Sequence, residues 1–449
     1  MKPIEPLALL LEAKELRAKL RQQIAGMNLP SVSLNLNIPG FPKSNDITNQ
    51  FFSVCLDELK IFLEANLISL SVKETHCRVD AAGDFFLVPV KAPRLTCREI
   101  KTRCELFEEK HTYGRFIDVD VTDERGNMVS SGKAKLCFYC RQKPADVCRH
   151  EGVHKTDELR SFLFSRMKSY CSKRFEDETA SKLASLALRA VLTEISLTPK
   201  PGLVDMVNNG SHTDMNYHTF IKSTSAIAVH FAELVHEGFR FGGKDLGKAL
   251  PVIRNIGLRM ERDMFAATNQ VNTQKGLIFL LGLSLFTGGL VYGRHGAFHA
   301  EVFRECIRDI CRNISQRELG VGKGIPETHG EKVFREFGVP GARGEAESGF
   351  PLVFDFGLPV LKAYRELNNE ALIKAFLAIA SNNNDTNIIH RGGMEVLNAF
   401  RGLSREALND FTPDNYNRLI DYCRKVNISP GGSADLLVVT IFIHSLIHL

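Results

Sequence analysis

Six glycine-containing segments in the second half of the chain place charged side chains beside flexible backbone. They are residues 199–205, 210–216, 272–276, 341–346, 385–387 with 391–393, and 429–435. Glycine lets a backbone approach a ligand closely, and helix N-termini attract phosphate groups. A purely structural helical bundle has no reason to combine glycine and charge at so many turns. We therefore expect these segments to share one phosphate and metal site.

Basic side chains and one helix start in these segments could bind phosphate. The predicted phosphate-binding residues are Lys200, Lys275, Arg343, Arg391, Gly431, Gly432 and Ser433. Each of the four cations lies close to a glycine or proline, and arginine can grip phosphate with two parallel hydrogen bonds. The alternative for each cation is a solvated surface charge, and Ser433 would then be a simple helix N-cap.

Acidic and imidazole side chains in the same segments could bind a metal or transfer protons. The candidates are Asp205, Asp214, Glu345, Glu347, Asp385, Asp435, His212 and His218. Mg²⁺ prefers a few carboxylates together with water and substrate phosphate, so we take Asp385 and Asp435 as candidate Mg²⁺ ligands. The alternative is a set of caps and surface charges. For the two histidines we favour hydrogen-bonded loop residues over acid or base groups.

A second pair of carboxylates occurs in the first half of the chain, within residues 114–120. Asp118 and Asp120 are separated by one apolar residue in a strand-like sequence. Residues two apart on a strand point to the same face, so this pair could hold the Mg²⁺ of a phosphoryl or nucleotidyl transfer site. The alternative is an exposed strand edge.

Three cysteines and a histidine follow with the spacing C-x₂-C-x₇-C-x₅-H. They are Cys137, Cys140, Cys148 and His154. Thiolates and imidazole are the preferred ligands of a structural, tetrahedral Zn²⁺. The second spacing differs from a standard zinc finger, so reduced cysteines without a metal are the alternative.

The elements that must position these residues change in character along the chain. Alternating apolar residues predict strands at 32–37, 85–90 and 116–121, with helices at 4–25 and 51–68. We therefore expect an α+β domain with a mixed or antiparallel sheet over residues 1–165. Helical periodicity then dominates and predicts an all-α bundle over residues 166–449. Its expected helices are 179–197, 219–237, 252–267, 277–292, 302–316, 368–380, 416–425 and 433–448.

The composition fits two soluble globular domains. A chain of 449 residues exceeds what one core normally serves. The net charge of +5 is small and scattered, so neither nucleic acid nor membrane is an expected partner. Residues 277–292 are too short and too rich in glycine to span a bilayer, so we expect a core helix there. Eleven cysteines without a secretory signal indicate the reducing cytoplasm.

The motifs of both halves resemble known families. Residues 201–205, 341–346 with 349–351, 385–387, 391–393 and 429–435 resemble the triphosphoribosyl-dephospho-coenzyme A synthase family, through essentially the whole second domain. Residues 37–40 and 114–120 and the cysteine cluster resemble the apo-citrate lyase phosphoribosyl-dephospho-coenzyme A transferases, over most of residues 30–160. Together they look like a fused, bifunctional form.

The resemblance implies two consecutive reactions. The second domain would join ATP to 3′-dephospho-coenzyme A and release adenine. The first would transfer the product to a serine of the acyl carrier (γ) subunit of citrate lyase and release diphosphate. Glu345 and Asp205 would then be catalytic beside a positively charged ribose. Asp118 and Asp120 would bind a metal on the triphosphate as catalytic carboxylates, and Arg115 would steady phosphate.

One residue departs from the family pattern, and two other functions stay open. Gln274 stands where the family loop Asn-Thr-His-Lys-Gly has histidine, and glutamine cannot titrate. One alternative is the equivalent prosthetic-group synthesis for malonate decarboxylase, which the citrate lyase type of first domain disfavours. The other is a non-catalytic nucleotide-binding assembly factor for citrate lyase, which the intact carboxylates disfavour.

Overall fold

The computed structural model describes residues 6–133, 135–319 and 328–449. The chain forms two compact units, Met1–Phe175 and Glu176–Leu449. One helix, α5 (Thr156–Ser196), contributes to both. It starts well before the predicted residue 179, because Leu163 and Met167 on its first half belong to the core of the first unit. The predicted domain boundary after residue 165 also falls inside α5 and stays a prediction.

The first unit contains a small antiparallel sheet. The sequence predicted a mixed or antiparallel sheet here, and the antiparallel form is the one observed. Its strands lie in the order β2-β4-β1-β5, and β3 also pairs with β4. The strands are β1 (Ser31–Leu36), β2 (Ser69–Leu70), β3 (His76–Asp80), β4 (Gly83–Lys91) and β5 (Ile117–Thr122). The three predicted strands correspond to β1, β4 and β5, whereas the short β2 and β3 were not predicted.

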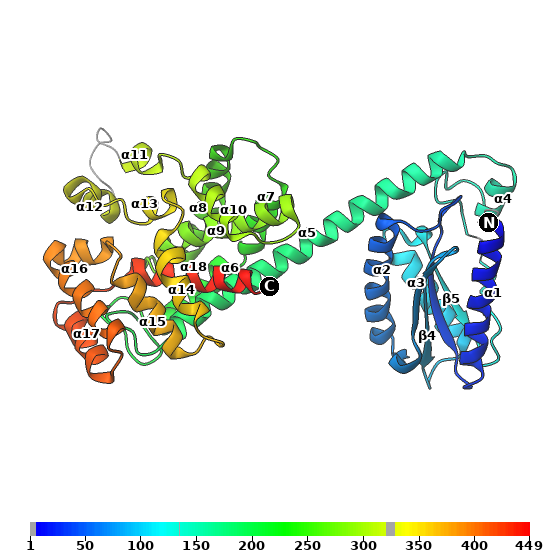
Figure 1. The fold of residues 1–449 in the computed structure, drawn as a ribbon, viewed down its shortest axis with the longest axis horizontal. Coiled ribbons are helices and arrows are strands. Elements are labelled where there is room, and N and C mark those ends of the chain that lie inside the picture. Colours follow the sequence, from blue (N-terminus) through cyan, green and yellow to red (C-terminus); the bar gives the residue numbers. More distant parts are fainter. Residues whose placement is uncertain (1–5, 134, 320–327) are drawn as a thin grey trace, which may run out of the picture. The chain divides into compact units, whose positions relative to one another are not determined.

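Helices cover both faces of this sheet (Figure 1). They are α1 (Pro6–Ala25), α2 (Asp46–Ala65), α3 (Cys97–Lys110) and α4 (Ala145–His150), with 3₁₀ turns η1 (Val72–Glu74) and η2 (Gly114–Phe116). Strand β4 is buried on both faces. Phe86 and Val88 join the core formed with α2 and α3, whereas Phe85 and Leu87 pack against Ile24 of α1. The alternation along β4 therefore fixes α1 on the opposite face from α2 and α3.

The second unit is helical throughout its described residues. After α5 come α6 (Tyr217–Ala228), α7 (Phe231–Arg240), η3 (Leu246–Lys248), α8 (Ala249–Ala267), α9 (Lys275–His295), α10 (Ala300–Ile310), α11 (Ile314–Leu319), α12 (His329–Phe337), α13 (Gly341–Glu347), the π-helical η4 (Leu352–Gly357), α14 (Leu358–Lys362), α15 (Asn369–Ala380), α16 (Thr386–Asn409), α17 (Pro413–Lys425) and α18 (Gly431–Ile447). The single helices predicted for 219–237 and 302–316 are wrong, because the chain turns at Val229–His230 and again between residues 310 and 314.

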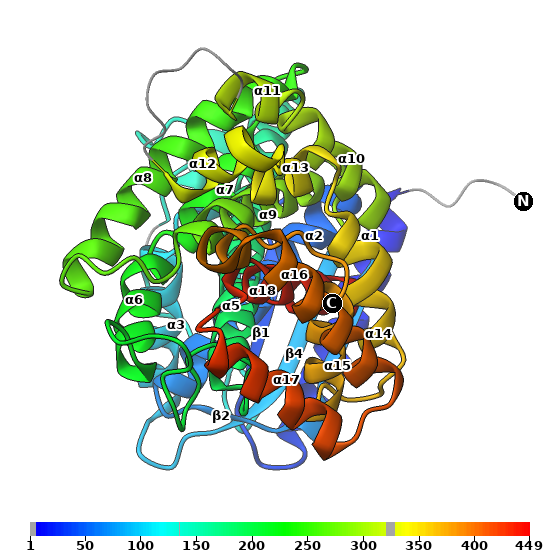
Figure 2. The ribbon, with the colours of Figure 1, turned by 90° about the vertical axis from the view of Figure 1, so that its left-hand side faces the viewer.

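Helix α9 forms the centre of the second unit, with α18 beside it (Figures 1 and 2). It is long and apolar enough to cross a membrane by length and composition, but 83% of its apolar window is buried inside the structure. Its close packing on α7 leaves no room for a side chain at one glycine of each helix, Gly289 of α9 and Gly238 of α7. A Cβ at Gly289 would meet the Val235 carbonyl oxygen at 2.1 Å, and one at Gly238 would meet that of Phe286 at 1.9 Å. The predicted core helix is confirmed.

Candidate active sites

The second unit contains a cavity of about 410 Å³ at one end of the α9–α18 core. All six glycine-containing segments contribute residues to its wall. Examples are Lys200, His212, Lys275, Gly341 and Gly432. The structure therefore brings together segments that are up to 230 residues apart in the sequence. We expected these segments to share one site because they all combine glycine with charged residues.

Three helices of this unit begin at the cavity. Helix α9 begins at Lys275, α16 at Thr386 and α18 at Gly431, and each of these residues lines the wall. The N-terminus of a helix presents unpaired N–H groups and about half a positive charge. Three such ends on one cavity make a binding site for an extended anion such as a triphosphate.

Two glycines allow these helix starts to lie close to carboxylates of the wall. A Cβ at Gly276 would lie 2.3 Å from a carboxylate oxygen of Asp435, and one at Gly432 would lie 3.2 Å from that of Asp385. Any side chain at Gly276 would displace the Asp435 carboxylate from its present position. These glycines therefore bring backbone and carboxylates to the same place in the wall.

The two predicted Mg²⁺ ligands both line the cavity but differ in their partners. Asp385 caps α16 and accepts hydrogen bonds from the backbone N–H groups of Asn387 (3.0 Å) and Ser433 (2.9 Å) and from the Ser433 hydroxyl. Asp435 has neither a hydrogen bond nor an ion pair within the described part of the chain. Burial raises the pKa of Asp435 well above its usual range, and the nearby charges of Glu194 and Asp385 raise it further. An enclosed carboxylate without a partner is a natural cation ligand.

Glu345 projects into the same cavity from α13. Its carboxylate accepts a hydrogen bond of 2.6 Å from the Leu352 backbone N–H. Burial raises the pKa of Glu345 to about 7. A carboxyl group with such a pKa can both accept and return a proton at neutral pH, which is the requirement for a general acid–base catalyst.

The cations of the cavity are few, and most are already paired. Lys200 is buried and forms a 2.7 Å ion pair with Glu194. Lys275 lies 2.9 Å from Glu261. Arg391 donates to the carbonyl oxygens of Ser211 (3.0 Å) and Asn427 (3.4 Å). Glu194 was not predicted as a site residue, because it lies inside a long regular helix, where a carboxylate is ordinarily a surface charge.

The structure keeps two predicted site residues out of this cavity. Residues 341–347 form helix α13, not a loop, and residues two apart on a helix point in different directions. Arg343 therefore points away from Glu345 and pairs with Glu318 at 2.8 Å. Asp205 braces its own turn and accepts from the backbone N–H groups of Lys200, Val207 and Asn208. Neither residue is retained as a substrate contact.

The remaining polar candidates have mainly structural contacts. His212 lies at the cavity and hydrogen-bonds Ser429 at 2.9 Å, and burial lowers its pKa. His218 and Glu347 are absent from the lining. Ser433 donates two hydrogen bonds to the Asp385 carboxylate and does not line the wall itself. Gln274 is buried and accepts a hydrogen bond from Ser223 at 2.5 Å, so it holds the start of α9.

Two further histidines of the wall were not predicted. His329 of α12 and His390 of α16 stack with ring centroids 3.8 Å apart. Burial, and then the charge of His390, lowers the pKa of His329. A stacked pair of imidazole rings offers a flat surface to a purine. Neither histidine lies in a glycine-rich motif, so only the tertiary structure reveals the pair.

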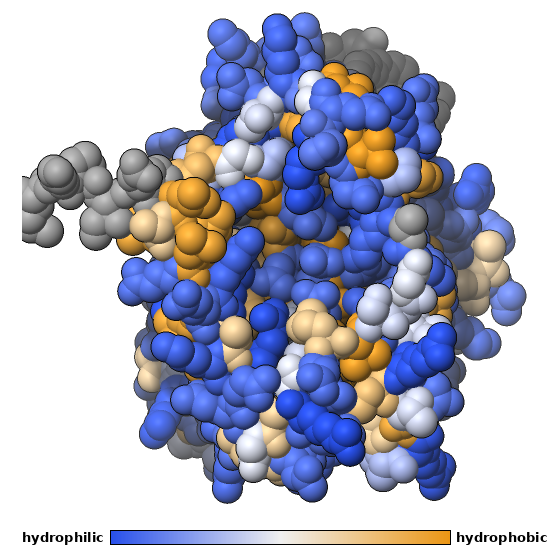
Figure 3. Space-filling model, turned by 90° about the vertical axis from the view of Figure 1, so that its right-hand side faces the viewer, coloured by the Kyte–Doolittle hydropathy of each residue, from blue (hydrophilic) through white to orange (hydrophobic). Residues whose placement is uncertain are grey.

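The first unit has a larger cavity, of about 1260 Å³. Within the described part of the chain, its wall contains eight lysines and arginines but only two carboxylates, those of Asp118 and Asp146. The basic residues are Lys14, Arg17, Arg21, Lys43, Arg115, Lys133, Lys135 and Arg149. The face of this unit drawn in Figure 3 is predominantly hydrophilic. Such a cavity suits a polyanion several times larger than phosphate.

The predicted carboxylate pair lies on β5 beside this cavity. Asp118 lines it and pairs with Lys135 at 2.6 Å, whereas Asp120 lies 3.8 Å from the ammonium of Lys101. Burial raises the pKa of Asp120, and the neighbouring charge of Asp118 adds to this shift. The two acids therefore share one face of the strand, as their spacing predicts.

Arginines complete the wall around these acids. The Arg115 guanidinium donates to the Leu136 carbonyl oxygen from Nε (3.1 Å) and Nη2 (2.8 Å), while its Nη1 is buried without a partner. Burial lowers the pKa of Arg21, and Asp120 acts against this shift. Lys14, Arg17 and Arg21 follow the three- and four-residue spacing of one helix face. That spacing in α1 was the missed signal for this cavity.

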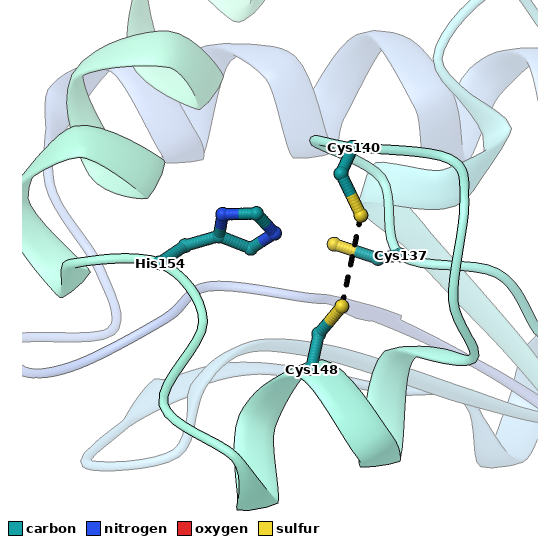
Figure 4. A group of neighbouring side chains, drawn as sticks. All are labelled: Cys137, Cys140, Cys148 and His154. Atoms are coloured by element: carbon teal, nitrogen blue, oxygen red, sulfur yellow. Dashed lines mark hydrogen bonds between the residues drawn. The ribbon is translucent and has the colours of Figure 1, made fainter.

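The four predicted zinc ligands also converge in the first unit, at the wall of its cavity. One ligand atom from each of Cys137, Cys140, Cys148 and His154 lies within 4.8 Å of all the others (Figure 4). Backbone N–H groups of Gln142, and then of Lys143, lower the pKa of the Cys140 thiol to about 6. The four residues are thus adjacent in space, although their spacing in the sequence differs from that of a standard zinc finger.

Comparisons with known proteins match both units. A family model for ATP:dephospho-CoA triphosphoribosyl transferase matches residues 180–449, and one for apo-citrate lyase phosphoribosyl-dephospho-CoA transferase matches residues 6–170. The chain is 32% identical to Protein CitXG of Leuconostoc mesenteroides subsp. cremoris, over 97% of this chain and 96% of that protein. It is 31% identical to Protein CitXG of Haemophilus influenzae, over 96% and 94%. A probable 2-(5''-triphosphoribosyl)-3'-dephosphocoenzyme-A synthase of Vibrio cholerae is 38% identical over 59% of this chain and 88% of its own length.

Proposed function

Because the chain belongs to the ATP:dephospho-CoA triphosphoribosyl transferase family, fused to an apo-citrate lyase phosphoribosyl-dephospho-CoA transferase, we propose that each of its two cavities performs one of two consecutive reactions. The chain is a bifunctional transferase. It makes the triphosphoribosyl derivative of 3′-dephospho-coenzyme A from ATP, with release of adenine, and transfers it to the acyl carrier protein of citrate lyase with release of diphosphate.

The cavity of the second unit is the proposed synthase site. The 2′-hydroxyl oxygen of dephospho-coenzyme A attacks C1′ of the ATP ribose, the bond from C1′ to adenine breaks, and a C1′–O bond forms. The attacking hydroxyl loses a proton and the departing adenine gains one. Glu345 is the proposed group that accepts the first proton, because its pKa of about 7 suits this exchange. The observation that carries this assignment is the convergence of Glu345 with three helix N-termini on one cavity.

Triphosphate binding in this cavity calls for positive charge beyond that of the protein. Among the described residues, the wall has three lysines and arginines (Lys200, Lys275 and Arg391) against five carboxylates (Glu194, Asp214, Glu345, Asp385 and Asp435). The partnerless carboxylate of Asp435 fits a cation ligand. Asp385 and Asp435 would hold Mg²⁺, which supplies charge neutralisation for the triphosphate when bound. The helix N-termini and Arg391 would then orient the phosphate groups.

The cavity of the first unit is the proposed transfer site. The serine hydroxyl of the carrier attacks the α-phosphorus of the triphosphate, a P–O bond forms to the serine, and diphosphate leaves. The basic residues of the wall would stabilise the negative charge that develops, apart from Arg17 and Lys135, which already pair with Asp80 and Asp118. Asp118 and Asp120 are the proposed ligands of a second Mg²⁺, and Lys135 holds the Asp118 carboxylate in place at 2.6 Å.

The carrier partner is proposed to be the γ subunit of citrate lyase, and the compartment the reducing cytoplasm. All eleven cysteines are free thiols in the structure, which supports a reducing environment. The match of the first unit to a citrate lyase transferase supports this carrier over that of malonate decarboxylase.

The decisive experiment follows both products in one sample. The purified chain is incubated with ATP, Mg²⁺ and dephospho-coenzyme A, and adenine is measured by chromatography. Apo-carrier of citrate lyase is then added, and its modification is measured by mass spectrometry, with the malonate decarboxylase carrier as the competing acceptor. We expect adenine in the first step and modification of the citrate lyase carrier in the second. Absence of adenine would contradict the synthase assignment, and preference for the other carrier would contradict the partner.

A further inference from the structure

Three cysteines and one histidine gather beside the cavity of the first unit, where the proposed transfer mechanism does not use them (Figure 4). They come from a tight turn, the short helix α4 and the loop after it. We propose that these four side chains bind one Zn²⁺ ion in a closed, structural site. They are Cys137, Cys140, Cys148 and His154.

The sulfur geometry is that of a metal site. Zn–S bonds are about 2.3 Å long, so two sulfurs of a tetrahedral site lie about 3.8 Å apart. The Sγ atoms of Cys140 and Cys148 are 3.6 Å apart. A disulfide needs about 2.05 Å, and all cysteines of the chain are free. The separation is thus much closer to two ligands of one ion than to a covalent bond.

His154 supplies the fourth ligand atom. Its Nε2 points toward the sulfurs in Figure 4 and is buried without a hydrogen-bond partner. The Tyr139 ring meets the imidazole edge-on, with centroids 4.9 Å apart, and fixes its orientation. A buried imidazole nitrogen that faces three thiols is placed to bind the same metal ion as their sulfurs.

A second cluster in the same unit contains a histidine whose two ring nitrogens both have protein partners. Cys55, Glu58 and His111 are equally close together. There, however, His111 Nδ1 accepts from the Tyr113 backbone N–H at 3.0 Å, so the neutral ring carries its proton on Nε2. That nitrogen lies 3.1 Å from the Glu58 carboxylate and donates to it. His111 has a protein partner for each nitrogen, which is the arrangement that His154 lacks.

The surrounding chain has few other groups that could hold it in place. Between β5 and α5, residues 123–155 contain one regular element, α4, within their described part. In that part the only buried side chains are Cys137 and Cys148. A segment of this length without an apolar core of its own is typically held by a metal or disulfides. Two of the four proposed ligands are therefore the only buried side chains in the described part of this segment.

The backbone already forms the turn that presents two sulfurs together. The Cys137 N–H donates to the Lys143 carbonyl oxygen at 2.8 Å, and the Arg141 N–H donates to that of Cys137 at 3.0 Å. Arg141 has a φ of +57°, in the left-handed region. Side chains rarely adopt this conformation without compensation, and the joint binding of Cys137 and Cys140 to one ion would compensate it.

The site connects to the cavity through its neighbours. Cys137, Cys148 and His154 line the cavity wall. The carbonyl oxygen of Leu136, next to Cys137, accepts both hydrogen bonds from Arg115. Lys135 precedes it and pairs with Asp118. The ion would therefore act as a positioning element for Arg115 and Lys135; this consequence rests on the proposed transfer function.

Metal content tests the site itself. The full chain is expressed with zinc, purified without chelators, and analysed by inductively coupled plasma mass spectrometry. We expect about one zinc per chain, and a cobalt-substituted sample should show the visible absorption of a tetrahedral, sulfur-rich site. Cys140→Ser should lower the zinc content, while Cys77→Ser, at an exposed cysteine of the same unit, should leave it unchanged. Wild-type chain without zinc, or with a Cys140–Cys148 disulfide by mass spectrometry, would overturn the proposal even if the variants do not fold.

Activity gives a separate readout of the positioning role. Removal of zinc should slow modification of the carrier and leave adenine release unchanged. Full zinc occupancy with no transfer activity before removal would contradict the transfer function and leave the metal site intact. Unchanged transfer after complete zinc removal would overturn the positioning role.

Discussion

The two cavities attract phosphate by opposite means. Counting the residues that the structure describes, the cavity of the first unit has eight basic side chains against two acids. That of the second has three against five and relies on three helix N-termini. Mobile side-chain charge suits a large substrate that is delivered to a protein acceptor. Fixed helix ends with acids suit a metal-bound triphosphate that must be held while a sugar reacts. The difference predicts different responses to mutation, metal, pH and salt.

The largest expected effect is that of Glu345→Gln on the synthase cavity. The amide keeps the shape and a hydrogen-bonding group but cannot take up a proton. Adenine release should fall by about 10²- to 10⁴-fold, as is usual for a lost general base. Initial rates of adenine formation at saturating ATP measure this. A decrease below about threefold would exclude Glu345 as the base.

A smaller effect is expected for Asp435→Asn, which tests the metal in the acid-rich cavity. Loss of this carboxylate should raise the Mg²⁺ concentration for half-maximal adenine release by about 10- to 100-fold. Asp214→Asn is the matched control, since Asp214 lines the same cavity but is largely exposed. Equal Mg²⁺ titration curves for both variants would contradict Asp435 as a ligand.

The pH profile should distinguish the two cavities next. A base must be unprotonated to act, so adenine release should rise as the pH increases through about 7, the pKa of Glu345. Below that pH the rate should fall about tenfold per pH unit. Modification of the carrier, measured with the purified triphosphoribosyl intermediate as substrate, should not show this decrease below pH 7. If the transfer reaction slows below pH 7 and adenine release does not, the assignment of the base to the synthase reaction is wrong.

Salt should act mainly on the basic cavity. Raising the ionic strength from about 0.1 M to about 1 M shortens the Debye length from about 10 Å to about 3 Å. We expect the KM of the transfer reaction for its triphosphate substrate to rise on the order of tenfold. The KM of the synthase for ATP at fixed free Mg²⁺ should change less. Equal salt dependence of both KM values would remove this distinction.

The smallest effect is expected for Arg343→Ala. Its guanidinium pairs with Glu318 outside the cavity, and a part-exposed ion pair contributes about 0–1 kcal/mol. Adenine release should change by less than about threefold. Arg391→Ala at the cavity wall is the comparison and should raise the KM for ATP more. A larger loss for Arg343→Ala would mean that this arginine swings to the substrate.

The sequence predicted the elements and motifs whose signals are local. Alternation identified β1, β4 and β5, and the glycine-rich segments do meet at one cavity. Glycine content misled the prediction at residues 341–346, because Gly341 and Gly344 lie in or at a helix that packs them closely. At residues 391–393 the prediction was partly right, since α16 continues but is kinked at Gly393.

What could not be predicted depends on distant parts of the chain. Glu194 and the stacked pair His329–His390 carry no local motif, and only folding brings them to the cavity. The basic face of α1 was readable from its spacing, but not the cavity that it faces. Asp205 was predicted to be catalytic because its segment matches the family. In the structure its carboxylate accepts hydrogen bonds from backbone N–H groups of its own turn.

The division of labour between the cavities is tested most directly by a crossed assay of Glu345→Gln and Asp118→Asn. Each variant is given ATP with dephospho-coenzyme A, and separately the purified triphosphoribosyl intermediate with apo-carrier. We predict that Asp118→Asn releases adenine and accumulates the intermediate without modifying the carrier. Glu345→Gln should release no adenine but modify the carrier when given the intermediate. If either substitution abolishes both reactions while the chain stays folded, the assignment of one reaction to each cavity is wrong.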